Sequence, residues 1–116
     1  MHLNYEFPDE LDFFERGFGW SEEYSHDEGQ FSFIMQYDNG DSLIFTHSPF
    51  YNCSVRVKLV QDEVVVFDVF KENVSSIAFQ AWGGEQVIRV YFSKGTENND
   101  FLVYFNPKPR LRYSEL

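Results

Sequence analysis

The sequence predicts a mainly β (α+β) fold with one short N-terminal helix. About six to eight strands form an antiparallel meander, as a curled sheet, a sandwich or a half-open barrel. Two observations support this prediction. From residue 31 onward, short apolar runs alternate with polar residues, and turn pairs such as Asn-Gly and Gly-Gly separate the runs. The connections are also too short for the helical crossovers that parallel strands require.

The helix is predicted over residues 8–16. Pro8 suits a first helical turn, where its missing N–H is no loss, and the acidic residues after it suit the positive end of the helix dipole. Leu11 and Phe14 follow at a helical spacing, and two glycines then end the pattern. Residues 21–30 are polar and are expected to form a loop.

The first strands surround the clearest turn signal in the chain. Residues 31–37 alternate, the Asp38–Asp41 segment contains Asn-Gly, and residues 43–46 pair back. Asn-Gly tolerates the two positive φ angles of a type I′ turn, which is the turn we predict there.

The next two strands differ in their pattern. Residues 53–59 alternate cleanly, so this strand is expected to have one wet face, with Cys53 as an inert core thiol on the other. Residues 64–70 are almost continuously apolar, with Asp68 as the single charge. That pattern predicts a central strand, buried on both faces or covered on one face by the N-terminal helix.

The remaining elements follow the same logic. Turns are expected at residues 71–73 and at Gly83-Gly84, and the prolines after Asn106 interrupt the ladder. Residues 93–100 are expected to form a mobile loop. The strands predicted in this part of the chain are 77–82, 87–92, 101–105 and an edge strand at 110–113.

Charge is concentrated at the start of the chain. The 116 residues carry a formal charge of -10, and residues 1–30 contain nine acidic side chains but only one basic one. Aromatic rings are interleaved with these acids, unlike in a solvating acidic tail. Acid with interleaved rings is typical of a protein-binding surface that meets a basic partner. The residues predicted to form it are Glu10, Asp12, Glu15, Phe18, Trp20, Glu22, Glu23, Tyr24, Asp27 and Glu28.

The search for chemistry favours a non-enzyme with no cofactor and no metal site. The three histidines have no recurring spacing, and neighbours such as Ser25, His26 and Asp27 do not converge in an extended loop. No nucleophile elbow, phosphate loop or metal-protease motif occurs. The acidic balance argues against nucleic acid as a partner, because phosphate binding needs a basic face.

Size and composition predict one domain over residues 1–116, in which the acidic segment 1–30 packs on an antiparallel sheet formed by 31–116. No apolar run approaches the ~20 residues of a membrane helix, and residues 1–7 lack the pattern of a signal peptide. The single cysteine fits a reducing compartment. We therefore expect a cytoplasmic protein that is a monomer or a weak homodimer when free.

In size, acidity and β-rich character, the whole chain resembles the immunity proteins of bacterial toxin systems, including those of contact-dependent growth inhibition. The resemblance implies a protein-binding inhibitor that neutralises a basic toxin, in particular a nuclease, by covering its active or substrate-binding surface. No residue motif carries the resemblance, so no family site is transferred to this sequence.

Two alternatives remain open at this stage. In the first, the protein binds or turns over a small ligand, and Trp82, Tyr91 and Tyr104 line a cavity in the sheet. In the second, it is a structural or adaptor subunit whose surplus rings form an oligomer interface. The basic run of Lys108, Arg110 and Arg112 either grips an acidic ligand or protects an edge strand from aggregation.

Overall fold

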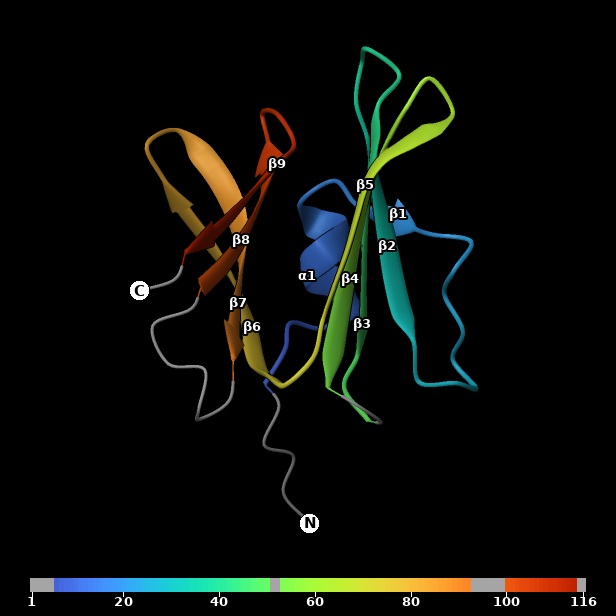
Figure 1. The fold of residues 1–116 in the computed structure, drawn as a ribbon, viewed down its shortest axis with the longest axis vertical. Coiled ribbons are helices and arrows are strands. Elements are labelled where there is room, and N and C mark those ends of the chain that lie inside the picture. Colours follow the sequence, from blue (N-terminus) through green and yellow to red (C-terminus); the bar gives the residue numbers. More distant parts are fainter. Residues whose placement is uncertain (1–5, 51–52, 93–99, 115–116) are drawn as a thin grey trace. The chain divides into compact units, whose positions relative to one another are not determined.

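The computed structural model describes residues 6–50, 53–92 and 100–114. That part of the chain contains one helix and nine strands. The strands form two antiparallel sheets, and neither sheet closes into a barrel (Figure 1). The predicted mainly β class and the antiparallel meander are therefore confirmed. The elements are α1 (Glu10–Glu15), β1 (Gly19–Trp20), β2 (Phe31–Gln36), β3 (Ser42–Ser48), β4 (Ser54–Gln61), β5 (Val64–Lys71), β6 (Val74–Trp82), β7 (Glu85–Phe92), β8 (Asp100–Asn106) and β9 (Arg110–Ser114).

The chain divides into two compact units. Asp9–Glu72 form the N-terminal unit, which contains α1 and the sheet β1-β2-β3-β4-β5. The C-terminal unit contains the sheet β6-β7-β8-β9 and the short segment before Asp9. The backbone of Glu6 joins this second sheet through a parallel bridge to Ser76. The single domain expected from the sequence stays a prediction.

Helix α1 begins later than predicted, because Asp9 and not Pro8 organises its first turn. The Asp9 carboxylate accepts from the backbone N–H of Asp12, and the Asp12 carboxylate accepts from that of Asp9, which completes a capping box. Pro8 precedes this cap. After the C-cap Arg16, Gly17 adopts a φ of +101°, a conformation that ends the helix at low cost only for glycine.

The predicted hairpin between β2 and β3 is present, but the turn type predicted for it is wrong. Gly40 donates to the carbonyl of Tyr37, Tyr37 donates to that of Asp41, and only Gly40 of the turn residues has a positive φ. This is a three-residue loop with a left-handed glycine at its end. The Asn39 side chain accepts from the Asp41 N–H, which holds Asn39 outside the left-handed region that a type I′ turn demands.

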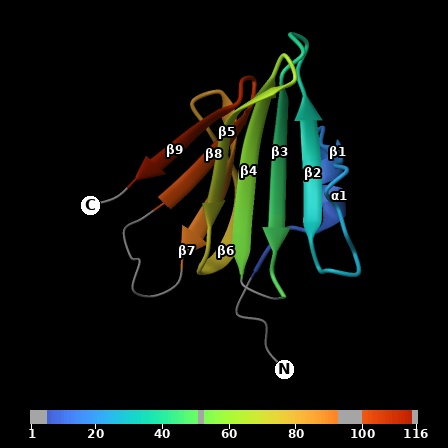
Figure 2. The ribbon, with the colours of Figure 1, turned by 45° about the vertical axis from the view of Figure 1, so that its right-hand side comes forward.

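One face of the five-stranded sheet packs against α1. The ring of Phe13 is fully buried and stacks on Phe33, with centroids 4.0 Å apart and planes 5° apart. Phe45 and His47 approach the same ring from β3. Strand β4 supplies the aliphatic part of this core, with Val55, Val57 and Leu59 buried as their alternation predicts. Figure 2 shows β2, β3 and β4 side by side, with α1 and β1 next to β2.

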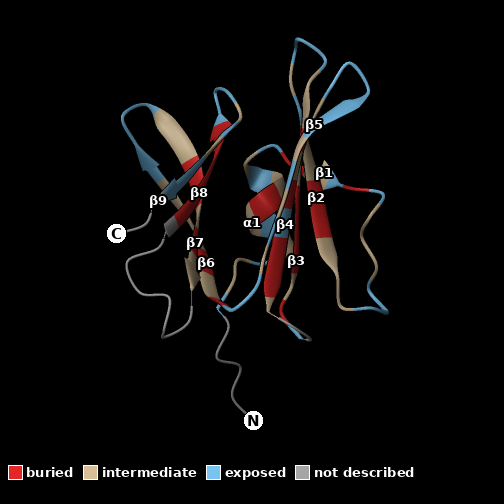
Figure 3. Cartoon of the chain, in the orientation of Figure 1, coloured by how far each residue is buried: buried red, intermediate tan, exposed pale blue. Residues whose placement is uncertain are grey.

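Two expectations for β4 and β5 are corrected. Cys53 lies before β4 with a φ of 49° and is only half-buried, so it is not on the core face of the strand. Strand β5 is not central: it is the last strand of its sheet, and most of its residues are exposed (Figure 3). An apolar run shows that a strand forms, whereas its place in the sheet depends on contacts distant in sequence.

The C-terminal unit contains the later strands near their predicted positions. Buried side chains on one face of its sheet include Ile77, Ile88, Val90 and Val103. Residues 93–99 of the expected loop lie outside the described residues. Strand β9 is an edge strand, as predicted, and follows the break at Pro107 and Pro109.

Candidate protein-binding surface

The acidic segment contacts the sheet at the β1 edge through a cluster of three aromatic rings and one carboxylate. The cluster consists of Phe14, Trp20, Tyr24 and Glu10. The Trp20 ring lies edge-on to Tyr24 at 4.1 Å and to Phe14 at 5.0 Å between centroids. The Tyr24 hydroxyl donates to the Glu10 carboxylate over 2.9 Å. Burial, together with this hydrogen bond and the charge of Glu10, raises the pKa of Tyr24.

The loop of residues 21–30, which we call the acidic loop, is ordered by its own polar side chains. The buried Ser21 hydroxyl accepts from the Glu23 N–H over 3.1 Å, and the Gln30 amide donates to the Glu23 carbonyl over 2.6 Å. Ser25 and Gln30 close the loop with an antiparallel bridge. These bonds hold the backbone of the predicted loop in place and leave Glu22, Asp27 and Glu28 exposed.

A long-range ion pair connects this loop to the middle of the sheet. The Glu23 carboxylate pairs with the Lys58 ammonium of β4, and both side chains are partly buried. In the sheet register, Ile34 lies opposite Ile44, and Ile44 lies opposite Lys58. These three residues alternate with the core residues of their strands, so they project from the sheet face opposite α1, which we call the outer face.

An open hollow of about 350 Å³ lies where the acidic loop meets the outer face. Its lining combines one indole ring, two carboxylates and two isoleucines. The lining residues are Trp20, Ser21, Glu22, Glu23, Ile34, Gln36 and Ile44. An apolar floor with a carboxylate rim suits the side chain of lysine or arginine, whose methylene stem is apolar and whose head is cationic.

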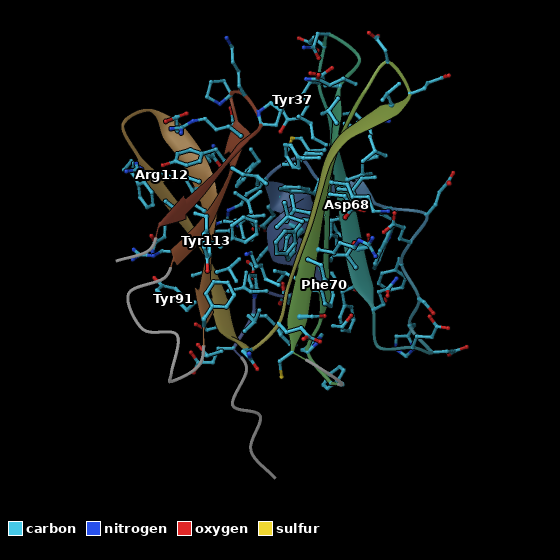
Figure 4. The ribbon with its side chains drawn as sticks, in the orientation of Figure 1. Tyr37, Asp68, Phe70, Tyr91, Arg112 and Tyr113 are labelled. Carbon is cyan, nitrogen blue, oxygen red and sulfur yellow. The ribbon has the colours of Figure 1, made fainter. Side chains whose placement is uncertain are left out.

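A second ion pair continues the row of charges toward β5. Asp68, which is labelled in Figure 4, lies opposite Lys58 in the register and binds the Arg56 guanidinium through two hydrogen bonds of 2.8 Å. The hydrogen bond from Arg56, with the charges of Arg56 and Lys58, lowers the pKa of Asp68 despite some desolvation. These two carboxylates and two cations largely offset each other, so the excess acid of this unit lies on α1, on the acidic loop, in the turn before β3 and in the turns on both sides of β5.

The structure gathers only part of the predicted surface. Glu10, Trp20, Glu22, Glu23 and Tyr24 lie together at the β1 edge and the hollow.

The other predicted residues have separate roles or positions. Asp12 is occupied by the capping box, whereas Glu15, Asp27 and Glu28 are exposed on α1 and the acidic loop. The predicted place of Phe18 in the binding surface is wrong, because its side chain is only 4% exposed and packs edge-on to Phe13 in the core. A ring so buried offers no contact surface without unfolding.

Sequence reasoning missed Ile34, Gln36, Ile44 and Lys58. Their signal was the alternation of their strands, which places them on the face opposite the core residues. Sequence alone does not show that the acidic loop folds over that face.

The three rings expected to line a ligand cavity lie on one face of the second sheet, and arginines cover two of them. Tyr104 is 1% exposed, with the Arg110 guanidinium 3.6 Å above its centroid, and Arg89 lies 4.9 Å above Tyr91. Arg110 also pairs with Glu85 through two hydrogen bonds. Cations therefore occupy a face of each tyrosine ring, whereas Trp82 is exposed and lies edge-on to Tyr104.

Two further features bear on chemistry. Among the described residues, no group of three or more His, Cys, Asp or Glu side chains is placed to hold a metal ion. Within the same residues, no helix has the length and apolarity needed to cross a membrane. His47 is buried among rings, and this burial lowers its pKa to about 3, so it is a neutral core residue at physiological pH.

Comparison with known proteins gives a likeness in structure but none in sequence. No family model and no curated protein matches the chain. A solved structure is similar with a TM-score of 0.80 over 97% of this chain and 98% of the matched chain, at 16% identity. It is a contact-dependent growth inhibition toxin–immunity protein complex from Klebsiella pneumoniae 342. The resemblance noted from the sequence is thus confirmed at the level of the fold, which recurs in a complex of that kind.

Proposed function

We propose that this chain is an immunity protein, which binds and neutralises the toxin of a contact-dependent growth inhibition system. The observation that carries the proposal is the fold, which matches nearly the full length of a chain from a toxin–immunity protein complex. That complex contains two kinds of component. The charge of -10 favours the inhibitor, because a toxin that acts on nucleic acid needs a basic surface.

The proposed contact surface is the acidic loop together with the β1 edge and the hollow beside it. Exposed carboxylates at Glu22, Asp27 and Glu28 attract a basic toxin and speed encounter. Trp20 and the isoleucine floor of the hollow then bind the stem of a lysine or arginine from the toxin. For a nuclease toxin, this surface would take the place of the phosphates of its substrate.

The proposed place of action is the cytoplasm, where a lone thiol such as Cys53 is kept reduced. The protein would act there as a stoichiometric inhibitor and not as an enzyme. Its effect would then depend on the affinity of the complex and on the ratio of the two proteins.

The test is to produce a candidate toxin of a contact-dependent growth inhibition system from the same genome in cells, with and without this chain, and to measure growth. We expect the toxin alone to arrest growth, and co-production to restore it through an isolable one-to-one complex. Growth arrest by the toxin in the presence of this chain, with no complex formed, would overturn the proposal. Arrest by this chain produced alone would identify it as the toxin component instead.

A further inference from the structure

Strand β5 presents an unusual edge. Among the strands of the described chain, it pairs only with β4. Four of its apolar side chains are about half exposed or more: Val64 (60%), Val65 (51%), Val66 (48%) and Phe70 (49%). Edge strands are usually short, charged or interrupted by proline, because their free N–H and C=O groups otherwise recruit another strand. Strand β5 has eight residues and no proline, and it exposes this apolar surface although it also carries the charged residues Asp68 and Lys71.

The geometry of β5 divides it into two parts. From Phe67 to Lys71 the ladder with β4 is regular, so alternate backbone groups point outward in the order that an added strand requires. A bulge at Leu59/Val60 leaves Val66 without an opposite residue on β4. The bulge displaces the exposed valines from the regular ladder. The edge therefore offers about five residues of backbone pairing, with an apolar cluster at one end.

Three exposed acids flank this edge. Asp62 and Glu63 lie in the turn before β5, and Glu72 follows Lys71, which is the last residue and the single base of the strand. Asp68, in the middle, is already bound by Arg56. A strand that pairs here would therefore gain most from basic residues at the end beside Asp62 and Glu63.

The net charge disfavours a second copy of this chain. A symmetric antiparallel pair centred on Phe67 would set Asp62 of each copy opposite Glu72 of the other, and Glu63 opposite Lys71, so one repulsive and one attractive pair offset each other. Each copy carries a charge of -10, and two such polyanions repel during approach.

We propose that the β5 edge binds an extended, basic segment of the toxin as an additional strand of the five-stranded sheet. This inference rests on the proposed function for the identity of the partner. Backbone hydrogen bonds along Phe67–Lys71 provide the pairing, and apolar side chains of the toxin strand cover Phe70 and the exposed valines. The toxin is then held at two places, by the acidic surface at the β1 edge and by the β5 edge.

A peptide probe tests the edge by itself. The probe is an octapeptide of alternating lysine and valine, compared with the same peptide N-methylated on alternate residues and with a glutamate–valine version. We expect the first peptide to shift the amide resonances of β5 and to slow exchange of its alternate N–H groups. The other two peptides should bind at least about tenfold more weakly. Equal binding of all three, or no change at β5 amides, would overturn strand addition of a basic segment.

Variants test the edge in the complex. Val66→Lys and Val66→Glu remove the same apolar side chain but have opposite charges, and Ala81→Lys places a lysine on β6, the edge strand of the other sheet. We expect Val66→Lys to weaken toxin binding roughly tenfold and Val66→Glu to weaken it about threefold or less. Ala81→Lys should leave the affinity for the toxin unchanged.

The outcomes separate the two proposals. Wild-type binding with equal affinities for all three variants would reject the β5 edge and leave the proposed function standing. Absence of toxin binding by the wild type would reject the proposed function, and the peptide probe would still decide on the edge. Dimerisation of the free protein that Val66→Lys abolishes would instead identify a second copy as the occupant, against this inference.

Discussion

The Glu23 carboxylate binds the Lys58 ammonium, although the two residues are 35 positions apart in the chain. This pair joins the acidic loop to the centre of the five-stranded sheet, beside the isoleucine floor of the hollow. It gives a cluster of acids, which would otherwise repel one another, a fixed position on a folded surface. The proposed binding surface therefore depends on a cation supplied by β4.

A double-mutant cycle with Glu23→Gln and Lys58→Met measures this pair. The side chains are 31% and 22% exposed, so we expect a coupling of about 0.5–1 kcal/mol in urea unfolding. The more exposed Arg56–Asp68 pair is the control, for which a smaller coupling is expected. Equal or larger coupling for the control would contradict the link between burial and strength.

The electrostatic part of binding is tested by Glu22→Lys, on the acidic loop. We expect the association rate with the toxin to fall about fivefold in low salt, and the difference to shrink when salt screens the charges. Asp38→Lys makes the same change of charge at the exposed β2–β3 turn and should leave the rate nearly unaltered. Stopped-flow measurements decide, and the same loss for both variants would show that only net charge matters.

Acid destabilisation should begin at His47. Its pKa is about 3 in the folded protein and about 6.5 when unfolded, so the unfolded chain binds the proton first as the pH falls below 6.5. Stability is therefore lost between pH 6.5 and about 3. At pH 5 this amounts to about 2 kcal/mol relative to pH 7.

His47→Phe removes that titration while keeping a ring in the stack. In this variant the free energy of unfolding should change little between pH 6.5 and 5. A slope as steep as that of the wild type would show that other groups cause the acid sensitivity.

Phe13 is the centre of the N-terminal core. Phe13→Ala removes a ring stacked on Phe33 and should cost about 3–5 kcal/mol of unfolding free energy. The matched control on the same helix is Leu11→Ala, because Leu11 is largely exposed and should cost less than about 1 kcal/mol. Similar losses for both variants would mean that α1 does not pack as described.

The turn at Gly40 is tested by comparison with another glycine. A Cβ at either Gly40 or Gly19 would meet no atom within 4 Å, but only Gly40 has a positive φ, of +93°. Gly40→Ala should therefore destabilise the protein by about 1 kcal/mol, whereas Gly19→Ala should be neutral or slightly stabilising. Thermal melting of the two variants measures the cost of that backbone conformation alone.

Local patterns in the sequence were sufficient to predict all of the elements except β1. Period-two alternation and turn residues identified the strands after residue 31, and the spacing of Leu11 and Phe14 identified the helix. These signals work because backbone pairing and side-chain direction are set within a few residues. Strand β1 was not predicted, because its two residues, Gly19 and Trp20, are too few to show the period-two alternation of a strand.

Position within the fold was decided by tertiary structure. Phe18 and Trp20 lie two residues apart in one aromatic, acidic segment, yet Phe18 is buried against Phe13 and Trp20 is exposed at the β1 edge. Val64–Phe67 form an apolar run, yet they lie on an edge strand and not in the centre of the sheet. Burial depends on which distant elements pack on a side chain, and no local pattern contains that information.

The sequence by itself thus determined the class of fold, the order of its elements and the concentration of acid before residue 31, because composition and period are local properties. Only the tertiary structure decided that Glu23 reaches Lys58, that Glu10 accepts from Tyr24 and that β5 has an unpaired edge among the described strands. Each of these results from chain segments meeting in space, which is governed by the packing of the whole unit.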